Sequence, residues 1–178
     1  MTRLHTVTLE HATGRAAEIF AGIKRATGKL PNAYAAVGSN SPEALQAALD
    51  LDGTLRKSSL SARQIEAVKL AVSAVAECDY CLAAHTLMGR HAGLSAEAMS
   101  AIRAGNPTGD AALDALIDFA RLLVGTSGTV AAEKLALVKA AGYSDAQVVD
   151  TLLTIAAITF TNLVNRVNDT EIDFPAIR

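Results

Sequence analysis

Apolar residues recur at helical spacing along most of the chain, whereas the strict alternation typical of β-strands is almost absent. In residues 111–125, one helical face is formed by Leu113, Leu116, Ile117, Ala120 and Leu123. In residues 14–28, the corresponding face is formed by Ala16, Ile19, Phe20 and Ile23. The pattern predicts an all-α protein of about seven or eight helices. No low-complexity linker divides the chain, so residues 1–178 are expected to form a single helical domain.

Capping residues mark where the expected helices begin and end. Serine caps precede the helices that follow Ser41, Ser61, Ser95 and Ser144. At Ser61 and Ser144, a glutamine three residues later completes a capping box. Glycine follows the helices that end near Gly28, Gly93 and Gly105. Residues 168–178 lack helical periodicity and are expected to form an irregular tail.

The composition favours closely packed helices and association between chains. Hydrophobic residues make up 51% of the chain and charged residues 19%, below the usual charged share of about 25%. Because only 4% of the residues are aromatic, the apolar excess is mostly alanine, leucine and valine. The formal net charge is -2, with neither a long basic run nor an acidic tail. Nucleic acid and membrane are therefore not expected as partners.

The sequence predicts a cytoplasmic location. Residues 1–20 carry charges and two histidines where a signal peptide needs a continuous apolar stretch. The apolar run of residues 152–164 is interrupted by threonines and is shorter than the roughly 18 residues of a membrane-spanning helix. In the reducing cytoplasm a lasting structural disulfide is rare, so the cysteines need another explanation.

The segment ECDYCLAAH, residues 77–85, contains both cysteines of the chain, and a histidine follows the second. On a continuous helix, Cys78, Cys81 and His85 would lie within about 60° of one another. Residues three apart have Cα atoms about 5 Å apart, inside the range that permits a disulfide. The imidazole lies one turn from Cys81 and can reach toward its sulfur, directly or through a water. A thiol nucleophile with a nearby base and a resolving thiol requires this spacing.

Three other roles for the two cysteines fit the sequence less well. Free cysteines are often small buried hydrophobes, so an inert core pair is one alternative. A zinc site would recruit Cys78, Cys81, His85 and His91. However, ligands within one helix do not surround a tetrahedral ion, and a second ligand pair is missing. A thioredoxin-like site is disfavoured because no βαβ pattern surrounds the motif. A redox-active pair on a helical scaffold is therefore favoured.

Residues 60–95 resemble the core of the alkylhydroperoxidase D-like proteins, which belong to the carboxymuconolactone decarboxylase superfamily. The shared signature is a glutamate twelve residues before the pattern C-x-x-C-x-x-x-H, and it corresponds to Glu66, Cys78, Cys81 and His85. The flanking segments GKLPN, SPEAL and NRVNDTEIDFP resemble longer, peroxidase-related members of the same group. The likeness therefore extends over most of the chain, with its specific motif in the core.

The resemblance implies an antioxidant enzyme that reduces hydroperoxides through a Cys78–Cys81 dithiol/disulfide cycle. Cys81 would be the peroxidatic thiol and Cys78 the resolving thiol, and His85 and Glu66 would relay protons. The resemblance and the apolar composition together imply a homo-trimer or homo-hexamer. The electron donor would be a dithiol that the sequence does not identify. No haem or flavin motif occurs, so neither a cofactor nor a metal is expected.

Tyr80 departs from the family pattern. The alkylhydroperoxidase D relay also has a histidine just before the second cysteine, where this chain has Tyr80. A phenol donates a hydrogen bond but is a poor acid–base group at neutral pH, so Tyr80 is only a secondary site candidate. This departure leaves a redox-responsive stress or binding protein with little turnover as an alternative function. A carboxymuconolactone decarboxylase-like lyase is another, although that branch lacks the cysteine pair.

Two further expectations concern the geometry of the site. On one straight helix Glu66 would point about 120° away from Cys78. The relay therefore requires a break within residues 76–79, with a new helix that starts at Cys78.

Asn165 and Arg166 lie on an otherwise apolar helix. They are expected either to line the pocket or to fix a subunit contact, and the subunit contact is favoured.

Overall fold

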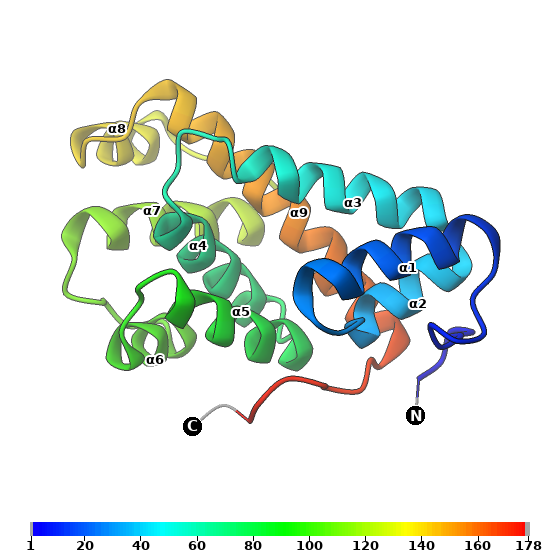
Figure 1. The fold of residues 1–178 in the computed structure, drawn as a ribbon. Helices are drawn as coiled ribbons and strands as arrows, with labels where there is room; N and C mark the ends of the chain where they lie inside the picture. The colour runs from blue at the N-terminus through cyan, green and yellow to red at the C-terminus, as the bar shows by residue number, and fades with distance from the viewer. Residues whose placement is uncertain (1, 177–178) are drawn as a thin grey trace.

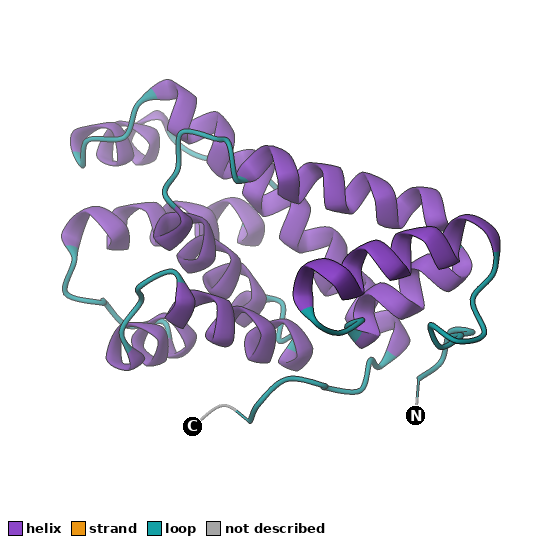
Figure 2. Ribbon diagram, in the orientation of Figure 1, coloured by secondary structure: helices purple, strands orange, loops and turns teal. Residues whose placement is uncertain are grey.

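The computed structural model describes residues 2–176, which form nine α-helices and no β-strand (Figure 2). The helices are α1 (Gly14–Thr27), α2 (Asn32–Asn40), α3 (Pro42–Leu55), α4 (Ala62–Val75), α5 (Asp79–His91), α6 (Ala96–Ala104), α7 (Ala111–Gly125), α8 (Ala132–Ala140) and α9 (Asp145–Asn168). The all-α prediction is confirmed. The described part has nine helices where seven or eight were expected. Ser41 is extended ahead of Pro42 and separates α2 from α3, as its predicted cap requires. Residues 169–176 form the irregular tail, and residues 177 and 178 lie outside the described part.

Side-chain caps begin the helices where the sequence predicts them. Backbone N–H groups in the first turns donate to the hydroxyls of Ser41, Ser61, Ser95 and Ser144. At Ser61 and Ser144 the glutamine side chain completes the capping box, and a cap of this kind contributes about 1 kcal/mol. α1 and α6 end at Gly28 and Gly105, both in the left-handed conformation that glycine adopts without steric cost.

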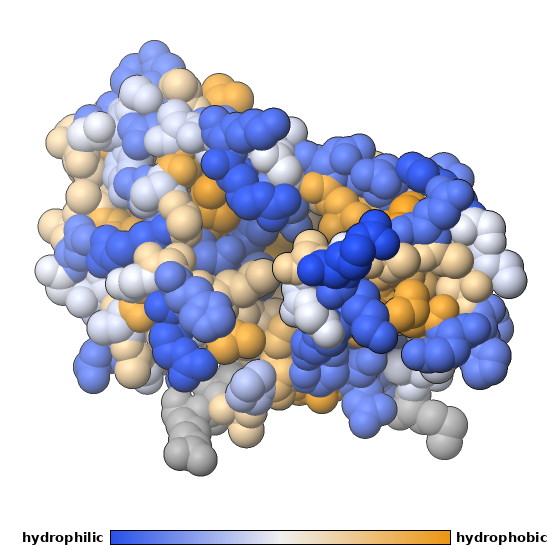
Figure 3. All heavy atoms as spheres, viewed as in Figure 1, coloured by the Kyte–Doolittle hydropathy of each residue, from blue (hydrophilic) through white to orange (hydrophobic). Residues whose placement is uncertain are grey.

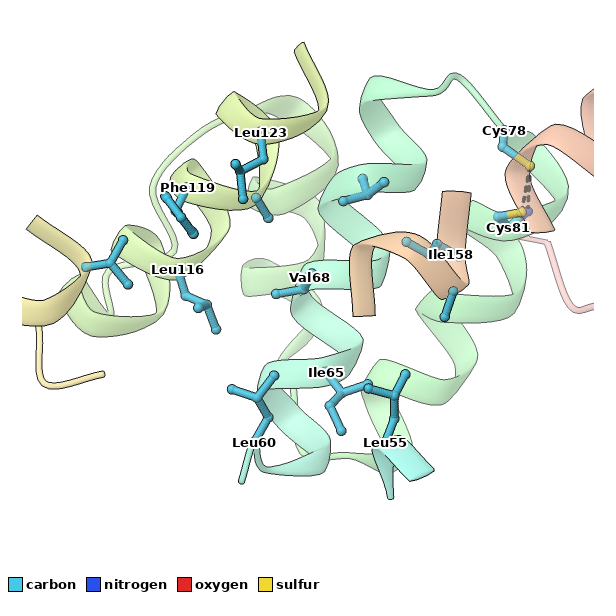
Figure 4. Close-up of a cluster of buried hydrophobic side chains, with 14 of the residues drawn as sticks. Leu55, Leu60, Ile65, Val68, Cys78, Cys81, Leu116, Phe119, Leu123 and Ile158 are labelled. Carbon is cyan, nitrogen blue, oxygen red and sulfur yellow. Dashed lines mark hydrogen bonds between the residues drawn. The ribbon is translucent and has the colours of Figure 1, made fainter. Parts of the chain in front are cut away.

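The central helix is α4, which contacts α5, α6, α7 and α9 (Figure 1). One side of α4 packs into the main core together with α7 and α9 (Figure 4), through Ile65, Val68, Val72, Leu116, Phe119 and Ile158. The other side packs against α6 and α7, through Ala67, Leu70, Ala71, Ile102 and Ile117. Because α4 is covered on both sides, polar side chains that it carries toward α5 are screened from water.

The N-terminal helices α1, α2 and α3 form a smaller group that contacts α9 through α2 and α3 (Figure 1). Phe20, Ile23 and Leu45 form its core. The helices approach closely at Gly38, where an added Cβ atom would lie 2.3 Å from the Phe20 ring. On the face shown in Figure 3, polar side chains divide the exposed apolar ones into small groups.

The polarity of α9 is inverted. Its buried side includes the polar residues Thr151, Thr154, Asn162, Asn165 and Asn168. Its exposed side carries Val149, Leu152, Phe160, Leu163 and Val167. Within the described residues, α9 is the one helix long and apolar enough to cross a membrane by length and composition, and 28% of its most apolar window is buried. Its buried asparagines and threonines pack inside the bundle, so α9 is a core helix with an uncovered apolar side.

We propose that a second copy of the chain covers the exposed side of α9. Together with the exposed Ala156, the apolar residues on that side are spaced three or four positions apart, as along the seam of two packed helices. Residues 151–165 contain no charged side chain, so two such surfaces can meet without burying an unpaired charge. Exposed apolar surfaces of this kind mark interaction sites. The expected homo-trimer or homo-hexamer needs an interface of this type.

Leu163→Glu should dissociate the assembly, because association would bury an unpaired carboxylate in the apolar surface. Light scattering should give an oligomeric mass for the wild type and a smaller mass for this variant. Leu137→Glu is a matched control on α8, since Leu137 is 60% exposed and Leu163 is 61% exposed. A monomeric wild type at micromolar concentration, or an equal effect of both substitutions, would contradict the proposed interface.

Candidate active site

A sharp reversal of the chain between α4 and α5 creates the candidate site. Glu77 has a φ of 50°, in the left-handed region. The N–H of Cys78 donates to the carbonyl of Ser73 at 3.1 Å, and the N–H of Glu77 donates to the carbonyl of Ala74 at 3.1 Å. This pattern is a Schellman motif, which ends a helix and redirects the chain. The predicted break within residues 76–79 is confirmed, and α5 begins directly after Cys78.

The two cysteines lie together in the first turn of α5. The Cys78 sulfur caps the helix by accepting the N–H of Cys81 at 3.4 Å. The two sulfurs are 2.7 Å apart and share a hydrogen bond (Figure 4). Both cysteines are free, and each is 2% exposed. The pair is therefore a buried, reduced dithiol in which disulfide formation needs only a small approach of the sulfurs.

The surroundings shift the pKa values of the two thiols in opposite directions. The hydrogen bond with Cys81 lowers the pKa of Cys78; burial opposes this effect, and the Cys81 N–H and the Arg166 guanidinium reinforce it. The hydrogen bond with Cys78 and burial raise the pKa of Cys81, against hydrogen bonds from Asn165 and Thr161. The positive end of the α5 dipole also favours a negative charge on Cys78. The first negative charge of the pair therefore rests on Cys78.

Glu66 of α4 and His85 of α5 meet across the reversed hairpin. The His85 Nδ1 and Glu66 Oε2 atoms are 2.7 Å apart, and the side chains are 11% and 13% exposed. Burial alone would raise the pKa of Glu66, but the charge and hydrogen bond of His85, with nearby Lys69, bring it below its ordinary value. No hydrogen bond joins His85 to either sulfur in the described part of the chain. With Nδ1 bound to the carboxylate, Nε2 is the ring atom left to exchange protons.

Tyr80 binds the C-terminal tail. Its hydroxyl donates to Asp173 Oδ1 at 2.8 Å and accepts the N–H of Ala33 at 3.1 Å. The rings of Tyr80 and Phe174 pack edge to face with centroids 5.4 Å apart. Lys29 pairs with Asp173 at 3.0 Å and lies 4.3 Å from the centre of the Phe174 ring. Burial raises the pKa of Tyr80, so the phenol stays protonated and acts as an anchor for the tail.

Asn165 and Arg166 of α9 contact the hairpin within the same protomer. Asn165 Nδ2 donates to the Cys81 sulfur at 3.3 Å, and Asn165 is 4% exposed. Arg166 donates to the carbonyl of Ala76, just ahead of the reversal. The expected subunit contact is therefore wrong for Asn165, because α9 packs this side chain against the dithiol. The sequence carries no clear signal for this placement, since an apolar helix would be expected to bury its apolar side.

Other candidate features lie apart from the sulfurs. His91 is exposed in the last turn of α5, a place that favours a cation. An open groove between α7 and α8 is lined by Phe119, Leu122 and Leu137 and contains neither cysteine. Among residues 2–176, no group of three or more Cys, His, Asp or Glu side chains is placed to hold a metal ion. The dithiol and the Glu66–His85 pair are therefore the reactive groups of the candidate site.

Together these groups can carry out two-electron chemistry. A dithiol yields two electrons when it closes to a disulfide. A buried carboxylate–imidazole pair can hold and deliver the protons that such a step moves. Both parts lie on one hairpin, so their relative position is set by a single turn.

Comparison with known proteins supports this description. Residues 42–121 match the model of the Carboxymuconolactone decarboxylase family. A peroxidase-related protein from Ralstonia eutropha JMP134, described as an alkylhydroperoxidase AhpD core, superposes with a TM-score of 0.84 at 17% identity, covering 97% of this chain and 92% of that chain. The debrominase Bmp8, in complex with 2,3,4-tribromopyrrole, superposes with a TM-score of 0.80 at 19% identity. The match covers 97% of this chain and 92% of that chain.

A peroxidase-related protein from Silicibacter sp. TM1040 has a TM-score of 0.79 at 22% identity, and the match covers 96% of this chain and 94% of that chain. No curated protein matches the chain in sequence. The family match spans α3 to α6 and most of α7, including the hairpin with both cysteines. Residues 42–121 are thus similar to the Carboxymuconolactone decarboxylase family, and the fold of the chain is that of the AhpD-like, peroxidase-related structures.

Proposed function

We propose that the protein is a dithiol-dependent peroxidase that reduces hydroperoxides through a Cys78–Cys81 dithiol/disulfide cycle. The observation that carries the proposal is the pair of buried, reduced sulfurs 2.7 Å apart, on the hairpin that joins Glu66 to His85. The family supports a peroxidase-related or decarboxylase-like enzyme. The dithiol favours the first of these, because decarboxylation of a lactone consumes no electrons from a reductant.

In the proposed cycle, the thiolate of Cys81 attacks the terminal oxygen of R–O–O–H. An S–O bond forms and the O–O bond breaks, which leaves a sulfenic acid on Cys81 and an alkoxide. The Glu66–His85 pair supplies a proton, and the alkoxide leaves as R–OH. The thiolate of Cys78 then attacks the sulfenic sulfur and releases hydroxide, which is protonated to water. An external dithiol returns two electrons and two protons to the disulfide.

Cys81 is the proposed peroxidatic thiol although the surroundings lower the pKa of Cys78 and raise that of Cys81. The hydrogen bond between the sulfurs makes the pair titrate as one unit. Transfer of the shared proton to Cys78 turns Cys81 into the thiolate, and the Asn165 amide donates a hydrogen bond to that sulfur. The lowered pKa of Cys78 allows it to ionise again for the resolving step.

The reductant and the compartment follow from the same chemistry. Reduction of a disulfide by thiol exchange needs two thiols, and the proposed electron donor is a dithiol protein or a small dithiol that supplies both. The cytoplasm, where thiols are kept reduced, is the proposed location. The structural likeness to the debrominase Bmp8 makes a brominated pyrrole a substrate to test beside hydroperoxides.

Prereduced protein should consume hydrogen peroxide or cumene hydroperoxide in stopped flow, with loss of two thiols per peroxide. Multiple turnovers should require an added dithiol. Oxidation without turnover with any dithiol would instead support a redox-responsive protein. Activity on a small lactone that survives removal of both cysteines would support a lyase. Bromide release from tribromopyrrole without reaction with peroxide would support a debrominase.

Single cysteine variants should separate the two thiol roles. Cys81→Ser should abolish the reaction with peroxide, because the attacking sulfur is lost. Cys78→Ser should form one dimedone-reactive sulfenic acid per chain but fail to turn over, because no thiol resolves it. Mass spectrometry after dimedone trapping reads both outcomes. An adduct on Cys78 in the Cys81→Ser variant, with none on Cys81 in the converse variant, would reverse the assignment.

Glu66→Gln should lower peroxide turnover about 10²-fold or more, because the amide does not support the imidazole as a proton donor. His85→Ala should slow thiol alkylation at neutral pH. Glu97→Gln is the control, since Glu97 is an exposed carboxylate on α6. Normal turnover of Glu66→Gln would give Glu66 a structural role only.

The same pair predicts a pH dependence of stability. Because the pKa of Glu66 is lowered in the folded protein, its contribution is present above the unfolded pKa and is lost as the pH falls through the folded value. Thermal denaturation should therefore show a larger loss of stability on acidification for the wild type than for Glu66→Gln.

Tyr80→Phe should leave peroxide turnover within about twofold, because the hydroxyl binds the tail rather than a reacting group. The free energy of unfolding should fall by about 1–3 kcal/mol, since Asp173 and the Ala33 N–H lose a hydrogen-bond partner. Limited proteolysis should cut the tail faster in this variant. A tenfold loss of turnover would show that the phenol takes part in proton transfer. Such a loss has the same free energy as a shift of about one pKa unit.

A further inference from the structure

Two asparagines of α9 contact the α4–α5 hairpin that holds the dithiol. Asn165 Nδ2 donates to the Cys81 sulfur at 3.3 Å. Asn162, one turn earlier, accepts the hydroxyl of Ser73 at 3.2 Å. The carbonyl of the same Ser73 accepts the N–H of Cys78. One asparagine therefore contacts Cys81 directly, and the other adjoins the turn that holds Cys78.

Each of these asparagines leaves one polar atom without a partner. Among the described residues, the buried side-chain nitrogen and oxygen atoms that lack a hydrogen bond are Asn162 Nδ2 and Asn165 Oδ1. The residues are 3% and 4% exposed. A buried unsatisfied polar group costs about 1–3 kcal/mol, so two such groups beside the reactive sulfurs call for a function.

The two open atoms are complementary in kind. Asn162 Nδ2 is a donor and Asn165 Oδ1 is an acceptor. Residues three apart on a helix are neighbours, with Cβ atoms about 5–6 Å apart. A small group that both donates and accepts hydrogen bonds can therefore bridge them. The O–O–H end of a hydroperoxide is such a group, since its hydroxyl donates and its inner oxygen accepts.

We propose that Asn162 and Asn165 bind the peroxide group of the substrate against Cys81. This inference rests on the proposed peroxidase function. Asn165 Oδ1 accepts the hydroperoxide O–H, and the other atom of the same amide holds the Cys81 sulfur, so the terminal oxygen is held beside the attacking thiolate. Asn162 Nδ2 donates to the inner oxygen, on which negative charge develops as the O–O bond breaks.

The two asparagines thus have separable roles. Asn162 acts on the leaving oxygen and leaves the thiols unchanged. Asn165 acts on the terminal oxygen of the hydroperoxide and also on the thiolate. Its amide nitrogen lowers the pKa of Cys81, against the stronger effects of Cys78 and burial. A donor placed on a developing negative charge is worth about 10²–10³ in rate.

The test uses Asn162→Leu and Asn165→Leu, which keep side-chain volume and remove both polar atoms. Stopped flow measures the rate of reaction of prereduced protein with hydrogen peroxide. The pH profile of alkylation by iodoacetamide measures the ionisation of the thiols with a reagent that has no peroxide group. Asn162→Leu should slow the peroxide reaction about 10²-fold and leave the alkylation profile unchanged. Asn165→Leu should slow the peroxide reaction and also move the alkylation profile to higher pH.

Two controls separate substrate binding from structural support. Ser73→Ala removes the hydrogen bond to Asn162 but keeps its amide N–H. Asn168→Ala removes a buried amide from the same helix, where Asn168 accepts the backbone N–H of Leu4 at 2.8 Å, away from the sulfurs. Both variants should keep the peroxide rate constant within about twofold. If Asn165→Leu does not fold, Asn165→Asp keeps the shape, and its charge should suppress the thiolate of Cys81.

Peroxide rates within about twofold of wild type in both leucine variants would overturn the proposal. An equal slowing of peroxide reaction and alkylation in Asn162→Leu would also overturn it, because such a variant has merely disturbed the dithiol. A wild type that alkylates normally but does not react with peroxide would contradict the peroxidase function itself, so the two failures are distinguishable.

Discussion

The candidate site depends on one backbone conformation, the left-handed Glu77 between α4 and α5. A residue with a side chain pays about 1–2 kcal/mol for this conformation, and such strain collects at functional sites. The reversal makes Cys78 the cap of α5 and lays α5 back along α4, so that His85 reaches Glu66. A continuous helix would separate the carboxylate from the imidazole and would leave the sulfur of Cys78 without the helix N-terminus.

The inverted polarity of α9 places the dithiol contacts and the proposed subunit interface on one helix. The inner side of the helix is polar because it faces the sulfurs and the α4–α5 turn, through Asn162, Asn165 and Arg166. The outer side is apolar and exposed in the single chain. One helix therefore carries the amides that adjoin the reactive groups and the surface proposed to meet a second copy, so association would also hold those amides in place.

The tail and the N-terminal helices close the site from another direction. Tyr80, which stands between the two cysteines, is tied to Asp173 and to the backbone of Ala33. Lys29, in the loop between α1 and α2, pairs with Asp173, and the N–H of Asn32 at the start of α2 donates to the same carboxylate. Each cysteine residue is 2% exposed, so a substrate reaches the dithiol only if the surrounding side chains move. The hydrogen bonds of Tyr80 to the tail and to the Ala33 backbone show that its hydroxyl is occupied by structural contacts.

The sequence by itself determined the helices, their caps and the reactive residue types. Helix boundaries are local, since a serine cap or a left-handed glycine acts within one turn. The expected break near Cys78 followed from helical spacing together with the Glu66 role that the family resemblance implied. Only the tertiary structure decided the opposite pKa shifts of the two thiols, the contacts of Tyr80 with the tail and the inward placement of Asn165. Each of these depends on a contact between residues far apart in the chain. For α9, periodicity showed a helix, but its buried polar side was set by what the helix packs against.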